Sequence, residues 1–197
     1  MATGAPVSWF AALAAATALV APTTWAAAAG GAVAGAASDR RSGHVGIGDW
    51  TIDGHGYDAQ RYSPLDRINE HNVKGLGLDW FYDLGTLRGV EATPLAIDGV
   101  LYDISAWDIT YAFDVRSGKL LWTYDPQVPK EWGRYACCEP VSRGLAWWQG
   151  HVIIATLDGR LISLDARTGK PVWTAQTFNK DEPYSIPARR AYSTERL

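Results

Sequence analysis

The sequence predicts an all-β fold built from small repeated sheets. Three observations support this prediction: short strand-like runs separated by tight turns, a repeated motif that ends in tryptophan, and a high tryptophan content. The chain has 197 residues and ten tryptophans, eight of which follow residue 49. Tryptophan side chains bury large areas and need a partner for the indole N–H. Such a content is typical of a packed β architecture with tryptophan at fixed positions.

Two segments of the chain, 97–126 and 148–177, align without a gap at an offset of 51 residues. Both carry Asp-x-x-(Ser/Thr)-Gly-Lys, a tight turn in which glycine supplies a positive φ and aspartate caps the backbone. Each copy also contains three strand-like runs. These runs span 99–105, 109–115 and 120–125 in the first copy, and 151–157, 160–166 and 171–176 in the second. The matched pairs are Gly99 and Gly150, Asp114 and Asp165, Gly118 and Gly169, Lys119 and Lys170, and Trp122 and Trp173.

A single sheet of this kind, with three strands and a further strand or loop, cannot bury both faces, so the copies must stack. A third, partial copy is LDWFYDL (78–84), which places Trp80 at the position of Trp122. An isolated closing strand before the first full copy is typical of a β-propeller, where it completes the last blade and removes a free edge. A plain β-sandwich is the alternative. Propellers have roughly 4–8 blades, so these copies form only part of a ring.

Residues 1–37 differ in composition from the rest. The apolar run 9–22 and the small residues after it resemble the core and cleavage region of a secretory signal, with a cut after Ala26 or slightly later. Residues 1–8 contain no Lys or Arg, so an uncleaved anchor or a disordered leader is the alternative. The apolar run is shorter than the ~20 residues of a transmembrane helix. We therefore expect an exported, periplasmic protein.

The charge of the chain gives no sign of a polyanionic partner. The net charge is −3 and 20% of the residues are charged. Nothing in this balance indicates a partner among nucleic acids or anionic membranes.

Four segments, in the same order, resemble the quinoprotein alcohol and methanol dehydrogenases that depend on pyrroloquinoline quinone (PQQ). They are QRYSPLDRINEHNVKGLGLDW (60–80), EATPLAIDGVLYDISAWD (91–108), YACCEPVSRGLAWW (135–148) and TLDGRLISLDARTGKPVW (156–173). The resemblance runs from about residue 49 to residue 186 and covers only the N-terminal portion of the family's domain. It implies the first blades of an eight-bladed propeller with tryptophan-docking motifs. It also implies oxidation of a primary alcohol with PQQ, and electron transfer to a cytochrome c or a membrane quinone.

The two cysteines of the chain, Cys137 and Cys138, are adjacent. Neighbouring Cα atoms lie ~3.8 Å apart, below the usual disulfide range of ~4.4–6.8 Å. A bond between them would hardly restrict the unfolded chain, so stability is a poor reason for it. The resemblance implies a vicinal disulfide that forms a flat platform against one face of the quinone, and export favours its oxidation. Two buried free thiols are the alternative.

Two further positions match cofactor-binding residues of the family. Glu91, in GVEATPL, matches a glutamate at the polar edge of the quinone, and Arg143, in CCEPVSRG, matches an arginine that binds PQQ oxygens. Without the resemblance, each would be read as a solvated turn residue. The predicted cofactor site is therefore Glu91, Cys137, Cys138 and Arg143.

The remaining conspicuous residues are predicted to have packing roles. Residues 49–63 form a loop that packs on the side of the propeller, and no histidines have a spacing suited to a metal. The docking tryptophans are Trp80, Trp122 and Trp173; the packing tryptophans are Trp107, Trp147 and Trp148; the histidines are His44, His55, His71 and His151.

The chain departs from the family after Ile186, where PARRAYSTERL (187–197) replaces the expected continuation. We hypothesise a frameshift or a premature stop, which translation of all reading frames beyond codon 186 would test. In the family, a Ca²⁺ or lanthanide ion polarises the quinone and an aspartate acts as base. No residue here matches the metal ligands or that base, so we name none and expect this polypeptide alone to be inactive.

The predicted organisation is a signal and leader (1–37), the N-terminal part of a quinoprotein propeller (38–186) and an unrelated tail (187–197). Two other functions stay open. One is a non-catalytic propeller scaffold that binds proteins in the cell envelope, although such a scaffold has no need of the cysteine pair. The other is a product that does not fold stably, because an open ring exposes strand edges.

Overall fold

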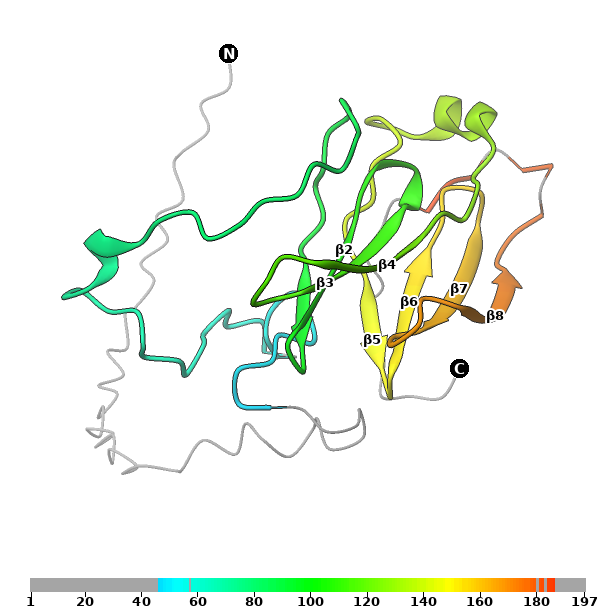
Figure 1. The fold of residues 1–197 in the computed structure, drawn as a ribbon. Helices are drawn as coiled ribbons and strands as arrows, with labels where there is room; N and C mark the ends of the chain where they lie inside the picture. The colour runs from blue at the N-terminus through cyan, green and yellow to red at the C-terminus, as the bar shows by residue number, and fades with distance from the viewer. Residues whose placement is uncertain (1–45, 57, 180, 183, 187–197) are drawn as a thin grey trace, which may run out of the picture. The chain divides into compact units, whose positions relative to one another are not determined.

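A computed structural model describes residues 46–56, 58–179, 181–182 and 184–186 (Figure 1). This part of the chain contains two four-stranded antiparallel sheets, each with its strands in sequence order. The first sheet contains β1 (Leu95–Ile97), β2 (Val100–Ile104), β3 (Thr110–Asp114) and β4 (Leu120–Tyr124). The second contains β5 (Ala146–Trp148), β6 (His151–Ala155), β7 (Arg160–Asp165) and β8 (Pro171–Gln176). The predicted leader, the predicted tail and His44 lie outside the described residues.

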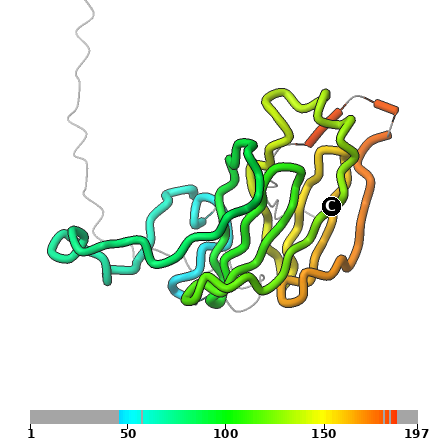
Figure 2. The backbone as a smooth tube through the Cα atoms, turned by 45° about the horizontal axis from the view of Figure 1, so that its top comes forward, coloured from blue at the N-terminus to red at the C-terminus, as the bar shows by residue number. Residues whose placement is uncertain are grey.

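The predicted all-β fold with repeated blades is confirmed. All six strand-like runs form strands, and the further element of each copy is also a strand, β1 or β5. The register shifts at equivalent places in the two sheets, between Ala112 and Phe113 and between Ser163 and Leu164. Figure 2 shows the two meanders following the same path next to each other. The sequence repeat therefore produces a structural repeat, including the irregularity before the last turn.

The turn before the last strand of each sheet is held by an aspartate. Asp114 Oδ1 accepts hydrogen bonds from the backbone N–H of Ser117 at 2.8 Å and from its hydroxyl at 2.6 Å. Asp165 Oδ1 accepts the same two bonds from Thr168, at 2.8 and 2.7 Å. These bonds favour the charged carboxylate, and each hydroxyl hydrogen bond is the main reason that the pKa of its aspartate lies below the ordinary value. The repeated motif is therefore a self-capping turn.

Tryptophan docking connects each repeat to the next one. The indole nitrogen of Trp80 donates to the carbonyl oxygen of Val115 at 2.9 Å, and its ring covers Gly118. Trp122 has the corresponding role one repeat later, with Gly169 under its ring. A Cβ atom at either glycine would lie 2.6 Å from the tryptophan ring, so only glycine fits under it. Trp173, at the equivalent place in β8, is 45% exposed.

Residues 78–84, predicted as a closing strand, are not a strand in the structure. A strand requires a ladder of backbone hydrogen bonds with a neighbour, and this segment pairs with no described strand. Trp80 nevertheless occupies its predicted docking place. Tyr82 also contacts Phe113 of β3, with ring centroids 4.8 Å apart. Side-chain contacts alone therefore attach this segment to the first sheet.

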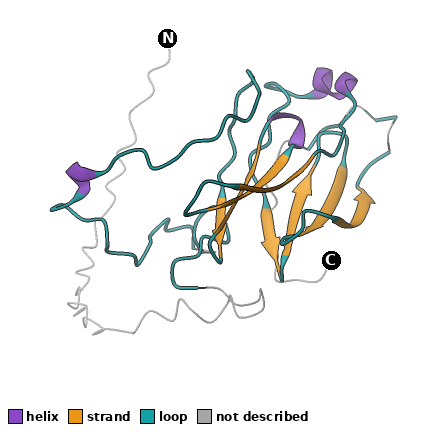
Figure 3. Cartoon of the chain, viewed as in Figure 1, coloured by secondary structure: helices purple, strands orange, loops and turns teal. Residues whose placement is uncertain are grey.

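The main apolar core lies between the facing sides of the two sheets. Its large, fully buried side chains are Leu95 and Ile104 from the first sheet, and Ile154, Ile162 and Leu164 from the second. Burial of each such side chain stabilises the fold by roughly 1.5–3 kcal/mol. The predicted packing role of Trp147 is confirmed, since it is 8% exposed within this core. Figure 3 shows the strands of both sheets side by side.

The first part of the predicted loop 49–63 packs on the first sheet, whereas residues 58–62 are exposed. Trp50 forms an antiparallel bridge with Ala96 of β1, with backbone hydrogen bonds of 2.6 and 3.0 Å. Its side chain contacts the main core, and its indole nitrogen donates to the carbonyl oxygen of Asp53 at 3.1 Å. This bridge extends the first sheet at the β1 edge.

A second, smaller apolar cluster lies beside the 3-10 helix η4 (Lys130–Tyr135). Its buried members are Val128, Trp132 and Leu157, and Trp107 packs against them from η3 (Ala106–Asp108). Both short helices lie at the same end of the sheets (Figure 3). The remaining described 3-10 helix, η2 (Val73–Gly75), has no buried residue. The η3 and η4 end of the sheets carries the candidate site.

Candidate functional site

A parallel bridge between the two sheets brings the predicted Glu91 and Arg143 together. Thr93, just before β1, pairs with Gly144, just before β5. Gly144 has a φ of 138°, a backbone conformation that favours glycine. Glu91 and Arg143 precede the two bridge residues, and Arg143 Nε lies 3.5 Å from Glu91 Oε2. Their side chains are 45% and 39% exposed, so this ion pair lies at an open surface.

The loop between β4 and β5 carries the cysteine pair. After η4 the chain continues through Ala136 to Cys137 and Cys138, which are both exposed. Their sulfur atoms lie 2.8 Å apart, and the structure contains them as two thiols in contact. The disulfide between them remains a prediction. The alternative to the disulfide is a pair of buried free thiols, but both cysteines are exposed. Their sulfur atoms are therefore accessible to a ligand.

Arg143 completes the group, because its guanidinium reaches the cysteine pair as well as Glu91. The pKa of the Cys137 thiol is lowered, first by its hydrogen bond with Cys138 and then by a hydrogen bond from Arg143. The pKa of Cys138 is raised, because a proton on Cys138 is held against the sulfur of Cys137. Glu91 adds to that rise by charge repulsion. All four predicted site residues therefore lie within one electrostatic group.

The chemistry of this group suits a planar anionic ligand. The guanidinium presents several donors in a fixed fork, which matches carboxylate oxygens. The neighbouring sulfur atoms are polarisable and exposed. The Glu91 carboxylate can accept hydrogen bonds beside them, so a ligand with both oxygen acceptors and a donor group would be satisfied. Among the described residues, no group of three or more His, Cys, Asp or Glu side chains could hold a metal ion.

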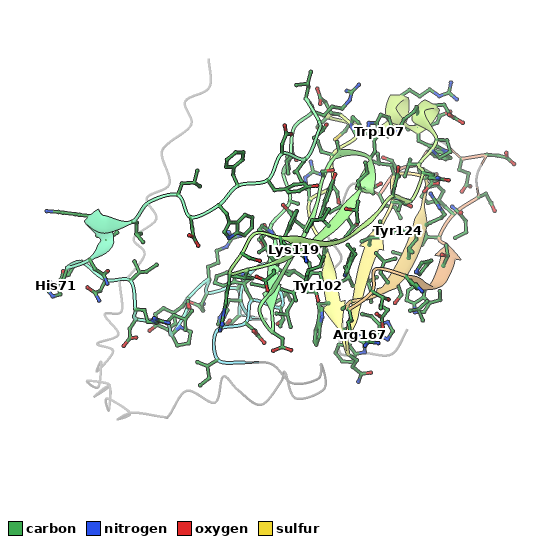
Figure 4. The ribbon with its side chains drawn as sticks, in the orientation of Figure 1. His71, Tyr102, Trp107, Lys119, Tyr124 and Arg167 are labelled. Atoms are coloured by element: carbon green, nitrogen blue, oxygen red, sulfur yellow. The ribbon has the colours of Figure 1, made fainter. Side chains whose placement is uncertain are left out.

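Other residues that the sequence analysis did not assign to the site support the cysteine loop. Glu139, directly after the pair, has a φ of 94°, which is unusual for a residue with a side chain. Its carboxylate lies 3.8 Å from the guanidinium of Arg88. In η3, Trp107 packs on the smaller apolar cluster at this end of the sheets (Figure 4). Asp108, the next residue, accepts a hydrogen bond from the backbone N–H of Leu157. The sequence contains one sign that this turn is unusual: Trp107 and Asp108 occupy the positions at which the second repeat has Asp158 and Gly159.

Comparison with known proteins decides the family. Residues 50–181 match the family model described as PQQ, the β-propeller domain of glucose, ethanol and alcohol dehydrogenases. The chain belongs to this family. The PQQ β-propeller chain therefore comes from a family of oxidoreductases, as its sequence predicts, and its two sheets are propeller blades.

Two relatives of this PQQ propeller chain are alcohol dehydrogenases by name. It is 54% identical over 142 residues to the 1-butanol dehydrogenase (cytochrome c) of Thauera butanivorans, which covers 71% of this chain and 20% of that protein. It is 48% identical over 158 residues to the dehydrogenase subunit of the alcohol dehydrogenase (quinone) of Gluconobacter oxydans, covering 80% and 20%. The chain thus spans about a fifth of the length of these relatives.

Solved structures give the same family. The quinohemoprotein alcohol dehydrogenase of Comamonas testosteroni matches with a TM-score of 0.64 and 50% identity, covering 66% of this chain and 20% of that one. A europium-containing methanol dehydrogenase matches with a TM-score of 0.68 and 35% identity, covering 73% and 26%. The described part of the PQQ propeller chain has no helix that is both long and apolar enough to cross a membrane.

Proposed function

We propose that this chain is the N-terminal part of an exported PQQ-dependent alcohol dehydrogenase, and that Glu91, Cys137, Cys138 and Arg143 form one wall of its quinone site. The observation that carries the proposal is the convergence of these residues. Arg143 lies 3.5 Å from Glu91 and lowers the pKa of the Cys137 thiol, although Glu91 comes from a separate segment, about 50 positions before the other two. In this role, Arg143 and Glu91 orient the polar edge of the quinone and the sulfur pair supports its flat face.

The bound quinone would supply the two-electron oxidation of a primary alcohol, with a Ca²⁺ or lanthanide ion as Lewis acid. No residue of this sequence matches the metal ligands or the catalytic base, so the chain alone contributes binding and no turnover. Electron transfer to a cytochrome c or a membrane quinone is part of the proposal, since the names of two relatives mention these acceptors. Periplasmic location rests on the leader 1–37, and the mass of the mature N-terminus would test its cleavage.

The direct test is an absorbance titration of PQQ into the purified chain, before and after reduction of the cysteine pair. We expect binding that reduction weakens, and an Arg143→Met variant that binds at least tenfold more weakly, or about 1.4 kcal/mol. Arg61→Met is the matched control, because Arg61 also forms an ion pair, at 3.4 Å from Asp53, but is not one of the predicted site residues. That control should bind like the wild type.

Two other outcomes would reject the proposal. A chain that is folded by circular dichroism and binds no PQQ would favour a propeller scaffold. Equal binding by the wild type and by Arg143→Met would remove Arg143 from the site. A chain that is unfolded or aggregated would agree with the third interpretation, a product that does not fold stably.

A further inference from the structure

The turn between β2 and β3 has an unusual conformation for its sequence. Trp107 and Asp108 both have left-handed backbones, with φ values of 63° and 62°. In the second repeat the equivalent pair is Asp158 and Gly159, and Gly159 has the positive φ, 81°. Left-handed backbone is unfavourable for residues with side chains, most of all for bulky ones. Such a conformation persists only where surrounding contacts enforce it, and it is found most often at functional sites.

The contacts that enforce it come first from the cysteine loop. The backbone N–H of Trp107 donates to the carbonyl oxygen of Pro140 at 2.8 Å, two residues after Cys138. Its indole ring lies over Gly133, where a Cβ atom would be 2.9 Å from the ring. Trp107 thus contacts the loop on both sides of the cysteine pair.

The ring has a charged partner on the same loop. The ammonium of Lys130 lies 4.0 Å from the centre of the Trp107 ring, a cation–π distance, and Arg88 lies 5.9 Å from it. Trp107 also packs on the smaller apolar cluster, to which Ala136, the residue before Cys137, belongs. One side chain therefore contacts the loop through its ring face and its apolar edges. Figure 4 shows Trp107 at the η4 end of the sheets.

Asp108 anchors the same turn to the second sheet. Its side chain is fully buried, and Oδ2 accepts a hydrogen bond of 2.8 Å from the backbone N–H of Leu157. The other oxygen, Oδ1, is buried and has no hydrogen-bond partner among the described residues. Burial of a half-satisfied carboxyl group is costly. Trp107 and Asp108 therefore attach their turn to the cysteine loop on one side and to the second sheet on the other.

We propose that Trp107 and Asp108 are positioning residues that hold the loop of Cys137 and Cys138 at the quinone-binding end of the blades. They act through the loop and the second sheet and touch no cofactor. The significance for PQQ rests on the proposed function, whereas the positioning of the loop is measurable without PQQ.

The test compares the full chain with Trp107→Leu by hydrogen exchange. We expect amides of 130–141 to exchange at least tenfold faster in the variant, while those of β6 and β7 keep their rates. The pH profile of Cys137 alkylation in the reduced protein should also move to higher pH, because Arg143 no longer faces that thiol. Trp107→Phe keeps an aromatic face for Lys130 and should restore most of both properties. If Trp107 only filled space, leucine would replace it as well as phenylalanine does.

Trp50→Leu is the matched control. Trp50 is also a partly buried tryptophan that contacts the first sheet, but it packs on β1 and away from the cysteine loop. It should leave the exchange of 130–141 unchanged. If Trp107→Leu does not fold, Gly133→Ala decides, because its methyl group displaces the ring by contact at 2.9 Å without removing it. Exchange within twofold of the wild type in the folded variant would overturn the proposal.

PQQ titration separates this proposal from the proposed function. Faster loop exchange in a chain whose wild type binds no PQQ would support positioning and reject the cofactor role. PQQ binding by the wild type, with loop exchange unaffected by Trp107→Leu, would reject positioning and leave the cofactor role standing.

Discussion

The indole nitrogen of Trp122 donates a hydrogen bond of 2.9 Å to the carbonyl oxygen of Ala166, across the boundary between two blades. The hydroxyl of Tyr102 reaches the same oxygen at 3.3 Å. Both donors come from the first sheet, and the acceptor follows β7 of the second. The boundary between the blades is therefore specified by directed hydrogen bonds as well as by apolar burial.

Substitution of Gly169 by alanine should destabilise the chain strongly. Its φ is 69° and the new Cβ atom would lie 2.6 Å from the Trp122 ring, so the ring must move out of its docked position. We expect a loss of about 2–4 kcal/mol in the free energy of unfolding. Gly99→Ala is the control, because Gly99 has a φ of 76° and nothing within 4 Å of its Cβ position. Urea titrations should give that control only the backbone term, about 1–2 kcal/mol.

The two equivalent tryptophans Trp122 and Trp173 should differ in their importance for this chain. Trp122 is 9% exposed and Trp173 is 45% exposed. Truncation of a buried tryptophan costs roughly 3–5 kcal/mol, so Trp122→Ala should lower the free energy of unfolding by about that amount. Trp173→Ala should lower it by less than about 1 kcal/mol. Similar losses in both variants would mean that Trp173 is covered in solution.

How much the sequence predicts depends on how local the signal is. The repeat at an offset of 51 residues predicts the strands and the Asp114 and Asp165 turns, because each depends on neighbours within its own repeat. It also predicts the docking tryptophans, because their partners are the same turn motif in the next repeat. The strand expected at 78–84 does not form, since strand structure depends on a partner strand and not on the segment alone. The tryptophan of that segment docks regardless, because docking needs only one turn of the next sheet.

The candidate site was predictable only in part. The resemblance identifies Glu91, Cys137, Cys138 and Arg143, and the structure brings these residues together through the bridge at Gly144. The roles of Trp107 and Asp108 could not be predicted, because their partners lie 33 and 49 positions along the chain, at Pro140 and Leu157. The sequence contains only one indication of this turn: the first repeat has Trp-Asp where the second has Asp-Gly.

The stability of the chain should fall between about pH 4 and pH 7 because of Asp108. Burial, and secondarily repulsion from Asp158, raise the pKa of Asp108 to about 7, although the Leu157 N–H and the Arg160 charge oppose the rise. Its pKa in the unfolded chain is about 3.9. The folded state therefore binds the proton more tightly, and the free energy of unfolding decreases as the pH rises through this window, then levels off.

Asp108→Asn tests this expectation. Asparagine keeps the acceptor for the Leu157 N–H, tolerates the left-handed backbone and carries no charge. Urea unfolding at a series of pH values should show a flatter profile for the variant, which gains on the order of 2–4 kcal/mol over the wild type at pH 8 and little at pH 4. Asp103, whose pKa burial raises to about 6, leaves a decrease of the same sign over a narrower pH range in both proteins. Parallel profiles would contradict the prediction.

The two thiols should react at different rates in the reduced protein. The pKa of Cys137 is lowered, by Cys138 and then by Arg143, and that of Cys138 is raised. Since the thiolate is the nucleophile, iodoacetamide at neutral pH should modify Cys137 first. Peptide mass mapping over time would measure both rates. Arg143→Met should slow the reaction of Cys137, and preferential modification of Cys138 would refute the assignment.

The direction of tryptophan docking has a consequence for synthesis on the ribosome. Trp122 cannot dock until Gly169 has been translated, 47 residues later. At roughly 5–20 residues per second, this ring stays without its partner for about two to nine seconds, and the first blade keeps an apolar face open for that time. The first blade is thus completed by the second, so the nascent chain presents an unfinished blade whose apolar surface is prone to aggregation until the next turn is made.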